Sequence, residues 1–205
     1  SVGTLLFYLL EHDNLLVGMS GPEQFLACLF CSVTPRTAGF NSVDTAALTD
    51  GSKFLTAVLM FIGGSPGSTA GGIKTTTLAV LLLCVWSSIR QTHGVEIFGR
   101  RLEEESIRQS AGILTINLSL MIGATILIMV FQNLPMSDIF FETCSAMGTS
   151  GMSTGITRAL GTGSRLVLIL LMYCGRIGSL SFALAFTRSS RKPQVQLPVE
   201  RITIG

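Results

Sequence analysis

The sequence predicts an all-α membrane protein that repeats one unit, made of a membrane helix, a half-helix, a Gly-centred loop and a second membrane helix. Of its 205 residues, 48% are hydrophobic and only 13% are charged, whereas soluble domains carry about 25% charged residues. Apolar stretches of two lengths alternate along the chain, some long enough to cross a bilayer and others too short. Each short stretch is followed by a Thr-x-Gly sequence, and this order occurs twice.

Three stretches reach the length of about 20 mostly apolar residues that a bilayer-spanning helix needs. They cover residues 54–86, 109–131 and 165–186. The first is interrupted between residues 63 and 74 by Gly, Ser, Thr and Pro, and the third has one charge in its interior, Arg176. Residues 2–10 have the composition of the end of a further span, so we expect the chain to be truncated at Ser1.

Two shorter apolar stretches, residues 22–33 and 136–147, suit half-helices that enter the membrane without crossing it. Pro22 stands near the first turn of one, and Asp138 gives the other an acidic first turn, as helix starts favour. The loops that follow have matching sequences. They are Thr37-Ala38-Gly39-Phe40 and Thr149-Ser150-Gly151-Met152. The chain is therefore interpreted as two copies of one unit.

The repeat divides the chain into four parts. Residues 1–90 are the first unit with its first helix truncated, 91–108 a cytoplasmic linker, 109–188 the second unit, and 189–205 a cytoplasmic tail. The linker and tail side carries eight Lys and Arg residues against four on the opposite side, which favours a cytoplasmic location for linker and tail. The two Gly-centred loops then enter the membrane from outside.

The composition argues against several classes of function. The net charge is +2 and no strongly basic stretch occurs, so no nucleic acid is expected as a partner. No catalytic triad, carboxylate pair or metal cluster is recognisable, so we expect neither an enzyme nor an organic cofactor. The five cysteines are odd in number and lie in apolar surroundings, which predicts buried thiols, the Cys28 and Cys31 pair included.

The paired Thr-x-Gly loops predict a path for a cation. Non-helical backbone at membrane depth is stable only where protein buries it or water lines it. A ring of backbone carbonyls can replace the water of a dehydrating cation, and Gly allows the positive φ that turns carbonyls toward one axis. The Thr hydroxyl adds another oxygen ligand. An ordinary Gly turn outside the membrane remains the alternative, but it accounts poorly for two matching loops.

Three motifs, at residues 34–41, 63–75 and 148–155, resemble the signatures of the Trk/Ktr/HKT potassium transporters. The resemblance covers nearly the whole chain and is strongest to Ktr-type membrane subunits. Residues 199–205 resemble the natural C-terminus of such a subunit. It implies four membrane–pore–membrane repeats of potassium-channel-like fold around one pore. This chain would supply the third repeat (1–90) and the fourth (109–188). The implied function is gated K⁺ uptake across a bacterial cell membrane.

The resemblance also implies the residues of the ion path. The filter would consist of Thr37, Ala38, Gly39, Phe40, Thr149, Ser150, Gly151 and Met152. Of these, Thr37, Gly39, Thr149 and Gly151 would bind K⁺. Because only Thr and Gly persist from the potassium-channel filter, we expect looser selectivity than in a true potassium channel.

An intramembrane gate beneath the filter is implied for the interrupted span. Its residues would be Gly63, Gly64, Ser65, Gly67, Ser68, Thr69, Gly71, Gly72 and Lys74. Arg176 would stand below the filter as an electrostatic barrier and contact carbonyls of this loop. A charge at mid-span costs about 2.5–3.5 kcal/mol on insertion scales, which favours a pore-facing role. The alternatives are a flexible linker for the loop and a packing role for Arg176.

Two other functions stay open at this point. One is a non-conducting membrane scaffold of channel-like fold. The other is a membrane ATPase, because residues 67–75 nearly match the P-loop pattern G-x-x-x-x-G-K-[ST]. The additional Ile73 turns the following side chain by about 100° in a helix, which argues against phosphate binding by Lys74.

The implied partners follow from the resemblance alone. They are a second copy of the protein in a homodimer, the N-terminal half of the same protein, a cytoplasmic nucleotide-binding ring of the RCK type, and the lipid bilayer. K⁺ is the implied transported ion, with Na⁺ as a second candidate. Coupling of the flux to Na⁺ or H⁺ is not specified by the sequence.

Overall fold

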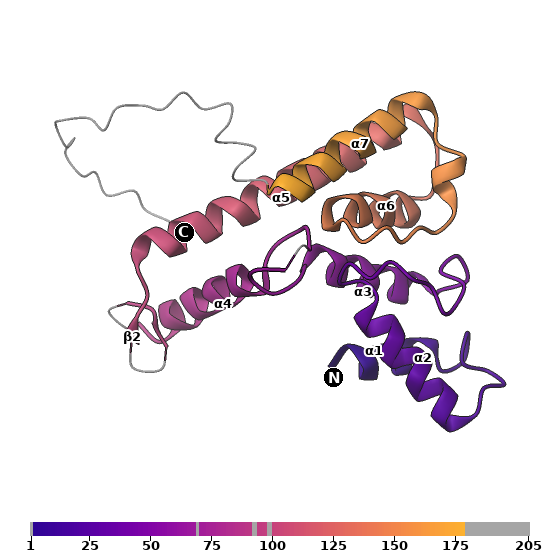
Figure 1. Cartoon of the computed structure of the whole chain (residues 1–205), viewed down its shortest axis with the longest axis horizontal. Coiled ribbons are helices and arrows are strands. Elements are labelled where there is room, and N and C mark those ends of the chain that lie inside the picture. Colours follow the sequence, from indigo (N-terminus) through magenta and orange to yellow (C-terminus); the bar gives the residue numbers. More distant parts are fainter. Residues whose placement is uncertain (1, 69, 92–93, 98–99, 179–205) are drawn as a thin grey trace.

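The computed structural model describes residues 2–68, 70–91, 94–97 and 100–178, which form a series of helices (Figure 1). The helices are α1 (Val2–Glu11), α2 (Gly21–Val33), α3 (Asp50–Phe61), α4 (Thr75–Ile89), α5 (Glu104–Phe131), α6 (Met136–Gly148) and α7 (Thr162–Ile177). A 3-10 turn, η1 (Ile156–Arg158), and an antiparallel pair of short strands, β1 (Glu96–Ile97) and β2 (Arg100–Arg101), are also described. The predicted all-α class is confirmed, and the short pair of strands was not predicted from the sequence.

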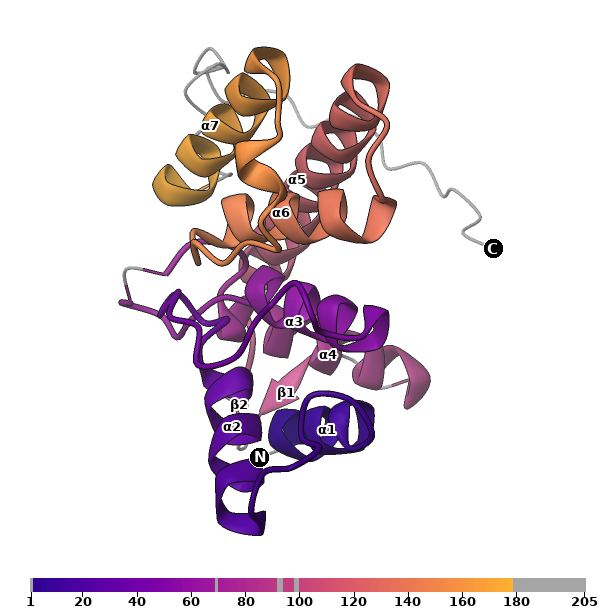
Figure 2. The same ribbon diagram turned by 90° about the vertical axis from the view of Figure 1, so that its right-hand side faces the viewer.

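The helices gather into two groups (Figures 1 and 2). α1, α2 and α3 pack at one end, α5, α6 and α7 at the other, and α4 lies alongside α5. The most extensive contact between helices joins α3 to α6, across the two groups. Buried Met60 of α3 packs there with Phe141 and Cys144 of α6. The half-helix of the second group is therefore the centre of the molecule.

α5 is the one described helix that is long and apolar enough to cross a bilayer, judged by length and composition. Its 28 residues begin five positions before the predicted span, with Glu104 and Glu105 in the first turn. Acidic side chains in that turn complement the positive end of the helix dipole. α7 begins at Thr162 and is described to Ile177, so the remainder of the predicted span to residue 186 lies outside the described residues.

The predicted interruption of the first unit's second helix is confirmed. α3 ends at Phe61 and α4 begins at Thr75, and between them Ile62 and Ile73 pair in a parallel β-bridge. The amide of Ile73 donates to the carbonyl of Phe61 over 3.0 Å, and the amide of Thr75 donates to that of Gly64 over 3.1 Å. These two backbone hydrogen bonds hold the ends of the segment together.

The two predicted half-helices are also confirmed, as α2 and α6, each of 13 residues. In α2, Ser20 and Glu23 form a capping box, in which the amide of Ser20 donates to the Glu23 carboxylate over 2.9 Å. α6 is buried along most of its length, from Ile139 to Gly148 apart from Phe140. Both helices are too short to cross a bilayer, and a loop follows each of them directly.

All five cysteines carry free thiols. Cys28, Cys144 and Cys174 are buried, as predicted. Cys31 and Cys84 are only half-buried, so the prediction of buried thiols is wrong for these two. Cys84 lies on α4, which packs mainly against one neighbour, α5, and therefore leaves much of its surface uncovered.

Candidate ion-conduction site

The two Thr-x-Gly loops, which follow α2 and α6, touch each other. Gly39 has φ +72° and Gly151 has φ +81°, the left-handed conformation that favours glycine. A β-carbon added to Gly39 would collide with the carbonyl oxygen of Ser150, because the backbone of one loop lies directly against the other. Thr37 and Thr149 also have positive φ, at 66° and 52°. Both loops therefore adopt the backbone conformation that Thr-x-Gly was expected to need.

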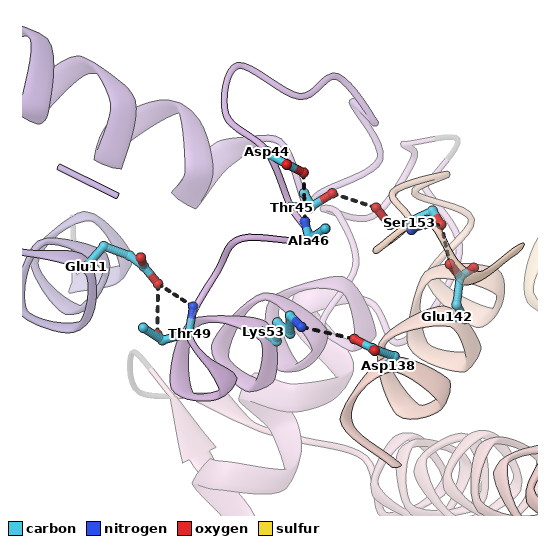
Figure 3. A network of polar contacts seen from close by, with 10 residues as sticks. Glu11, Asp44, Thr45, Ala46, Thr49, Lys53, Asp138, Glu142 and Ser153 are labelled. Carbon is cyan, nitrogen blue, oxygen red and sulfur yellow. Dashed lines mark hydrogen bonds and ion pairs between the residues drawn. The ribbon is translucent and has the colours of Figure 1, made fainter. Parts of the chain in front are cut away.

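Hydrogen bonds hold each loop to its own half-helix. In the first loop, the hydroxyl of Thr34 donates to the carbonyl of Phe40 over 2.5 Å. In the second, the amide of Ser150 donates to the carbonyl of Ser145 over 3.1 Å, and the two Ser hydroxyls lie 3.3 Å apart. Thr45 then bridges the loops, since its hydroxyl donates to the carbonyl of Ser153 over 2.5 Å (Figure 3). The two loops thus form one connected structure.

Both half-helices present their C-terminal ends to the loops. α2 ends at Val33 and α6 at Gly148, and the Thr-x-Gly sequences begin within four residues of those ends. A helix C-terminus carries a partial negative charge of about half an elementary charge, which stabilises a nearby cation. The electrostatics of the meeting point therefore favour a cation over an anion.

The interrupted segment between α3 and α4 contacts the second loop. The amide of Gly71 donates to the hydroxyl of Thr149 over 3.0 Å. A β-carbon on Gly71 would lie 2.7 Å from that same side chain, so the two backbones approach closely. A β-carbon on Gly148 would likewise collide with the carbonyl of Met60, near the end of α3. The segment is therefore packed against the point where α6 passes into its loop.

Lys74 stabilises this segment from its far end. Its ammonium group donates to the carbonyl of Ser68 over 3.0 Å and to that of Ala70 over 2.7 Å. Four further predicted gate residues lie before Ser68 in the chain: Gly63, Gly64, Ser65 and Gly67. Gly72 lies between Ala70 and Lys74. Thr69, the remaining member of that predicted set within the loop, lies outside the described residues. The ammonium group is engaged by its own loop, an arrangement unlike that of a P-loop lysine directed at phosphate.

Arg176 lies in the last turn of α7 and is exposed. The residue before it, Gly175, packs so closely on the carbonyl of Met147 that a β-carbon there would collide with it. Arg176 is therefore near the end of α6 at which the second loop begins. The predicted contact of its guanidinium with carbonyls of the interrupted segment stays a prediction.

Three polar contacts outside the predicted filter and gate residues were not foreseen (Figure 3). Lys53 of α3 and Asp138 of α6 form an ion pair at 3.0 Å, with side chains only 13% and 16% exposed. Glu11 accepts hydrogen bonds from the amide and hydroxyl of Thr49, over 2.9 and 2.8 Å. Glu142, in the middle of α6, accepts hydrogen bonds from the loop that follows that helix. The sequence signal for Glu142 is a carboxylate in the middle of a half-helix that is expected to lie in the membrane.

Comparison with known proteins agrees with this architecture. The TrkH family model, described as a cation transport protein, matches residues 1–195. The Ktr system potassium uptake protein D of Bacillus subtilis is 34% identical over 203 residues, covering 99% of this chain and 45% of that protein. The potassium/sodium uptake protein NtpJ of Enterococcus hirae is 36% identical over 210 residues, with coverage of 99% and 47%. The chain thus spans about half the length of these relatives.

A solved structure shares the fold. The crystal structure of the potassium transporter TrkH from Vibrio parahaemolyticus aligns with a TM-score of 0.73 at 20% identity, covering 91% of this chain and 42% of that one. At 20% identity this likeness shows a shared fold. Membership of the family rests on the sequence match over residues 1–195. The chain therefore belongs to the TrkH family of cation transport proteins, as a multi-pass protein of the cell membrane.

Proposed function

We propose that this chain takes part in K⁺ uptake by forming two of the units around a gated cation pore in a bacterial cell membrane. The observation that carries the proposal is the contact of two Gly-centred loops, each at the C-terminal end of a half-helix. That arrangement supplies backbone carbonyls and negative helix ends at one place. The names of two relatives, a potassium uptake protein and a potassium/sodium uptake protein, agree with it.

In the proposed pore, Thr37, Gly39, Thr149 and Gly151 bind K⁺ through their backbone carbonyl or hydroxyl oxygens. Ala38, Phe40, Ser150 and Met152 complete the two filter loops. Each K⁺ would lose part of its water as it enters, and these oxygens would replace that water. The side-chain hydroxyl of Thr149 is also the acceptor of the Gly71 amide, so one group would serve both the filter and the segment beneath it.

We further propose that residues 63–74 form the gate, with Arg176 as an electrostatic barrier next to it. Two observations support the gate. The segment is fixed at its ends by the Ile73 and Thr75 amides, and it packs on Thr149 at the inner end of the filter loop. Moving the segment away from the filter loop would break the hydrogen bond between the Gly71 amide and the Thr149 hydroxyl. The proximity of Gly175 to α6 supports the position of Arg176.

The larger assembly is proposed from the family. Residues 1–90 and 109–188 would be the third and fourth membrane–pore–membrane repeats, with 91–108 and 189–205 in the cytoplasm. The N-terminal half of the same protein would supply two more repeats, and the pore-forming protein would pair into a homodimer on a nucleotide-binding ring of the RCK type. Na⁺ is a second candidate ion, and no enzymatic step is needed for passive permeation.

Ion flux into liposomes that contain the purified, assembled transporter tests the proposal. We expect K⁺ uptake down its gradient, with a preference over Na⁺ measurable from reversal potentials. Folded, inserted protein without any cation flux would instead support a non-conducting scaffold. Uptake that requires ATP hydrolysis by the protein itself would contradict passive permeation.

A further inference from the structure

The second filter loop is attached to a buried carboxylate. Glu142 lies on α6 with only 5% of its surface exposed. Its carboxylate accepts a hydrogen bond from the hydroxyl of Ser153 (Figure 3). It accepts another from the hydroxyl of Thr157 over 2.9 Å. One side chain thus accepts hydrogen bonds from two hydroxyl groups in residues 153–157, the outward leg of the loop.

Ser153 extends this attachment to the other loop. Its carbonyl accepts the hydroxyl of Thr45 over 2.5 Å, and its hydroxyl accepts the amide of Gly155 over 2.9 Å. Ser153 stands only two residues beyond Gly151. A shift of the Glu142 carboxylate would therefore move the chain immediately after the proposed ion ligands, and with it the contact between the loops.

The first loop is held in a different way. When Cys31 is aligned with Cys144, the position that matches Glu142 is Leu29, which has no polar group. The first loop is fixed instead by the Thr34 hydroxyl on the carbonyl of Phe40. The carboxylate is therefore not a general requirement of a half-helix in this fold, and it acts on the second loop alone.

A packing role alone does not account for this carboxylate. Burying a carboxylate costs free energy that an apolar side chain of similar volume would avoid. Both hydroxyl donors belong to the segment that follows α6. The interactions that compensate for burial thus fix the conformation of the loop.

We propose that Glu142 is a positioning residue for cation selectivity, which holds the outward leg of the second filter loop and thereby fixes the carbonyls of Ser150 and Gly151. The inference rests on the proposed function, since it assumes that this loop lines a cation path. Glu142 itself does not contact the ion in this arrangement. Its loss should change which cation is preferred more than how much protein folds.

The test compares variants of the assembled transporter by two measurements. One is the K⁺ over Na⁺ permeability ratio from reversal potentials, and the other is the rise in melting temperature on adding K⁺ or Na⁺ to purified protein. Glu142→Ala should lower the ratio by about two- to tenfold, which corresponds to one or two lost hydrogen bonds of ordinary net strength. Glu142→Gln keeps one acceptor oxygen and should fall between Ala and the wild type.

Ser153→Ala supplies the same test from the other partner. It removes one donor and leaves α6 unchanged, so it should lower the ratio even if Glu142→Ala does not fold. Asp138→Asn is the matched control, because this carboxylate lies on the same helix but pairs with Lys53 and not with the loop. It should lower the melting temperature and leave the selectivity unchanged.

The outcomes separate the two proposals. A folded, inserted wild-type protein without any cation flux, and without a rise in melting temperature on adding K⁺ or Na⁺, would remove the proposed function. A wild-type preference that persists in Glu142→Gln and Ser153→Ala would overturn the role of Glu142 alone. Loss of folded protein in both Glu142 variants, with normal selectivity in Ser153→Ala, would assign Glu142 to folding and equally overturn the inference.

Discussion

Replacing Gly39 and Gly151 by Ala should have unequal effects, although the two residues occupy matching positions. Both have a left-handed φ, which costs a residue with a β-carbon about 1–2 kcal/mol. At Gly151 nothing lies within 4 Å of the added carbon, so this is the whole expected cost. At Gly39 the carbon also collides with the carbonyl oxygen of Ser150, and such overpacking adds about 1–3 kcal/mol.

The collision should appear in selectivity as well as in stability. Relief of the contact at Gly39 requires the carbonyl of Ser150, a proposed filter residue, to move. We therefore expect Gly39→Ala to lower the K⁺ over Na⁺ permeability ratio by about tenfold or more, equivalent to about 1.4 kcal/mol. Gly151→Ala should lower it less, because only its own loop is strained.

Reversal potentials in mixed K⁺ and Na⁺, with inserted protein quantified in parallel, measure both effects. Gly18→Ala is the matched control: Gly18 also has a positive φ, +88°, with nothing within 4 Å of an added β-carbon, and it lies in the turn between α1 and α2. It should cost similar stability to Gly151→Ala without any change in selectivity. Unchanged selectivity in both filter variants, or an equal loss in Gly18→Ala, would refute the reasoning.

Three further predictions concern the gate and the contact between units. Shortening residues 64–71 should raise basal K⁺ flux several-fold in a flux assay, because the segment that packs on the filter is removed; a fall in flux with normal insertion would make the segment a support. Arg176→Gln should leave insertion near normal and increase flux per molecule, whereas normal flux with poor insertion would indicate a packing role. Asp138→Asn should destabilise the α3–α6 contact by about 1–3 kcal/mol, between the values for exposed and fully buried ion pairs, because Lys53 loses its partner. Thermal unfolding in detergent checks the last of these, and an unchanged melting temperature would contradict it.

The order of helices and loops could be predicted because it depends on the length of apolar stretches. The half-helices α2 and α6, at 13 residues each, have less than half the length of the 28-residue α5. The interruption after Phe61 was predictable for a local reason, since Gly63-Gly64-Ser65-Pro66 does not continue a helix. Matching Thr-x-Gly sequences after both half-helices then indicated the candidate site.

Helix boundaries were less predictable where polar residues begin a helix. α3 starts at Asp50, four positions before the predicted span, because the Thr49 hydroxyl accepts the amide of Ser52. α5 starts at Glu104 for the similar reason that its first turn is charged. Hydropathy marks only the apolar part of such helices, so their polar first turns are missed.

The contacts within the site could not be predicted, because they join residues far apart in the chain. Gly39 lies against Ser150, and Thr45 reaches Ser153, only because α3 and α6 pack across the two units. Glu142 could be singled out as an unusual carboxylate, but its two hydroxyl donors depend on how the loop folds back over α6. Sequence spacing carries no information on these distances.

The position of a bound ion tests most directly whether the two Thr-x-Gly loops form the filter. Tl⁺ can replace K⁺ in carbonyl sites and scatters X-rays anomalously, so crystals of the assembled transporter in Tl⁺ would locate it. We expect anomalous peaks in contact with both loops, beside the carbonyls of Thr37 to Gly39 and Thr149 to Gly151. Tl⁺ bound elsewhere, with both loops free of it at saturating concentration, would contradict the assignment of these loops as the filter.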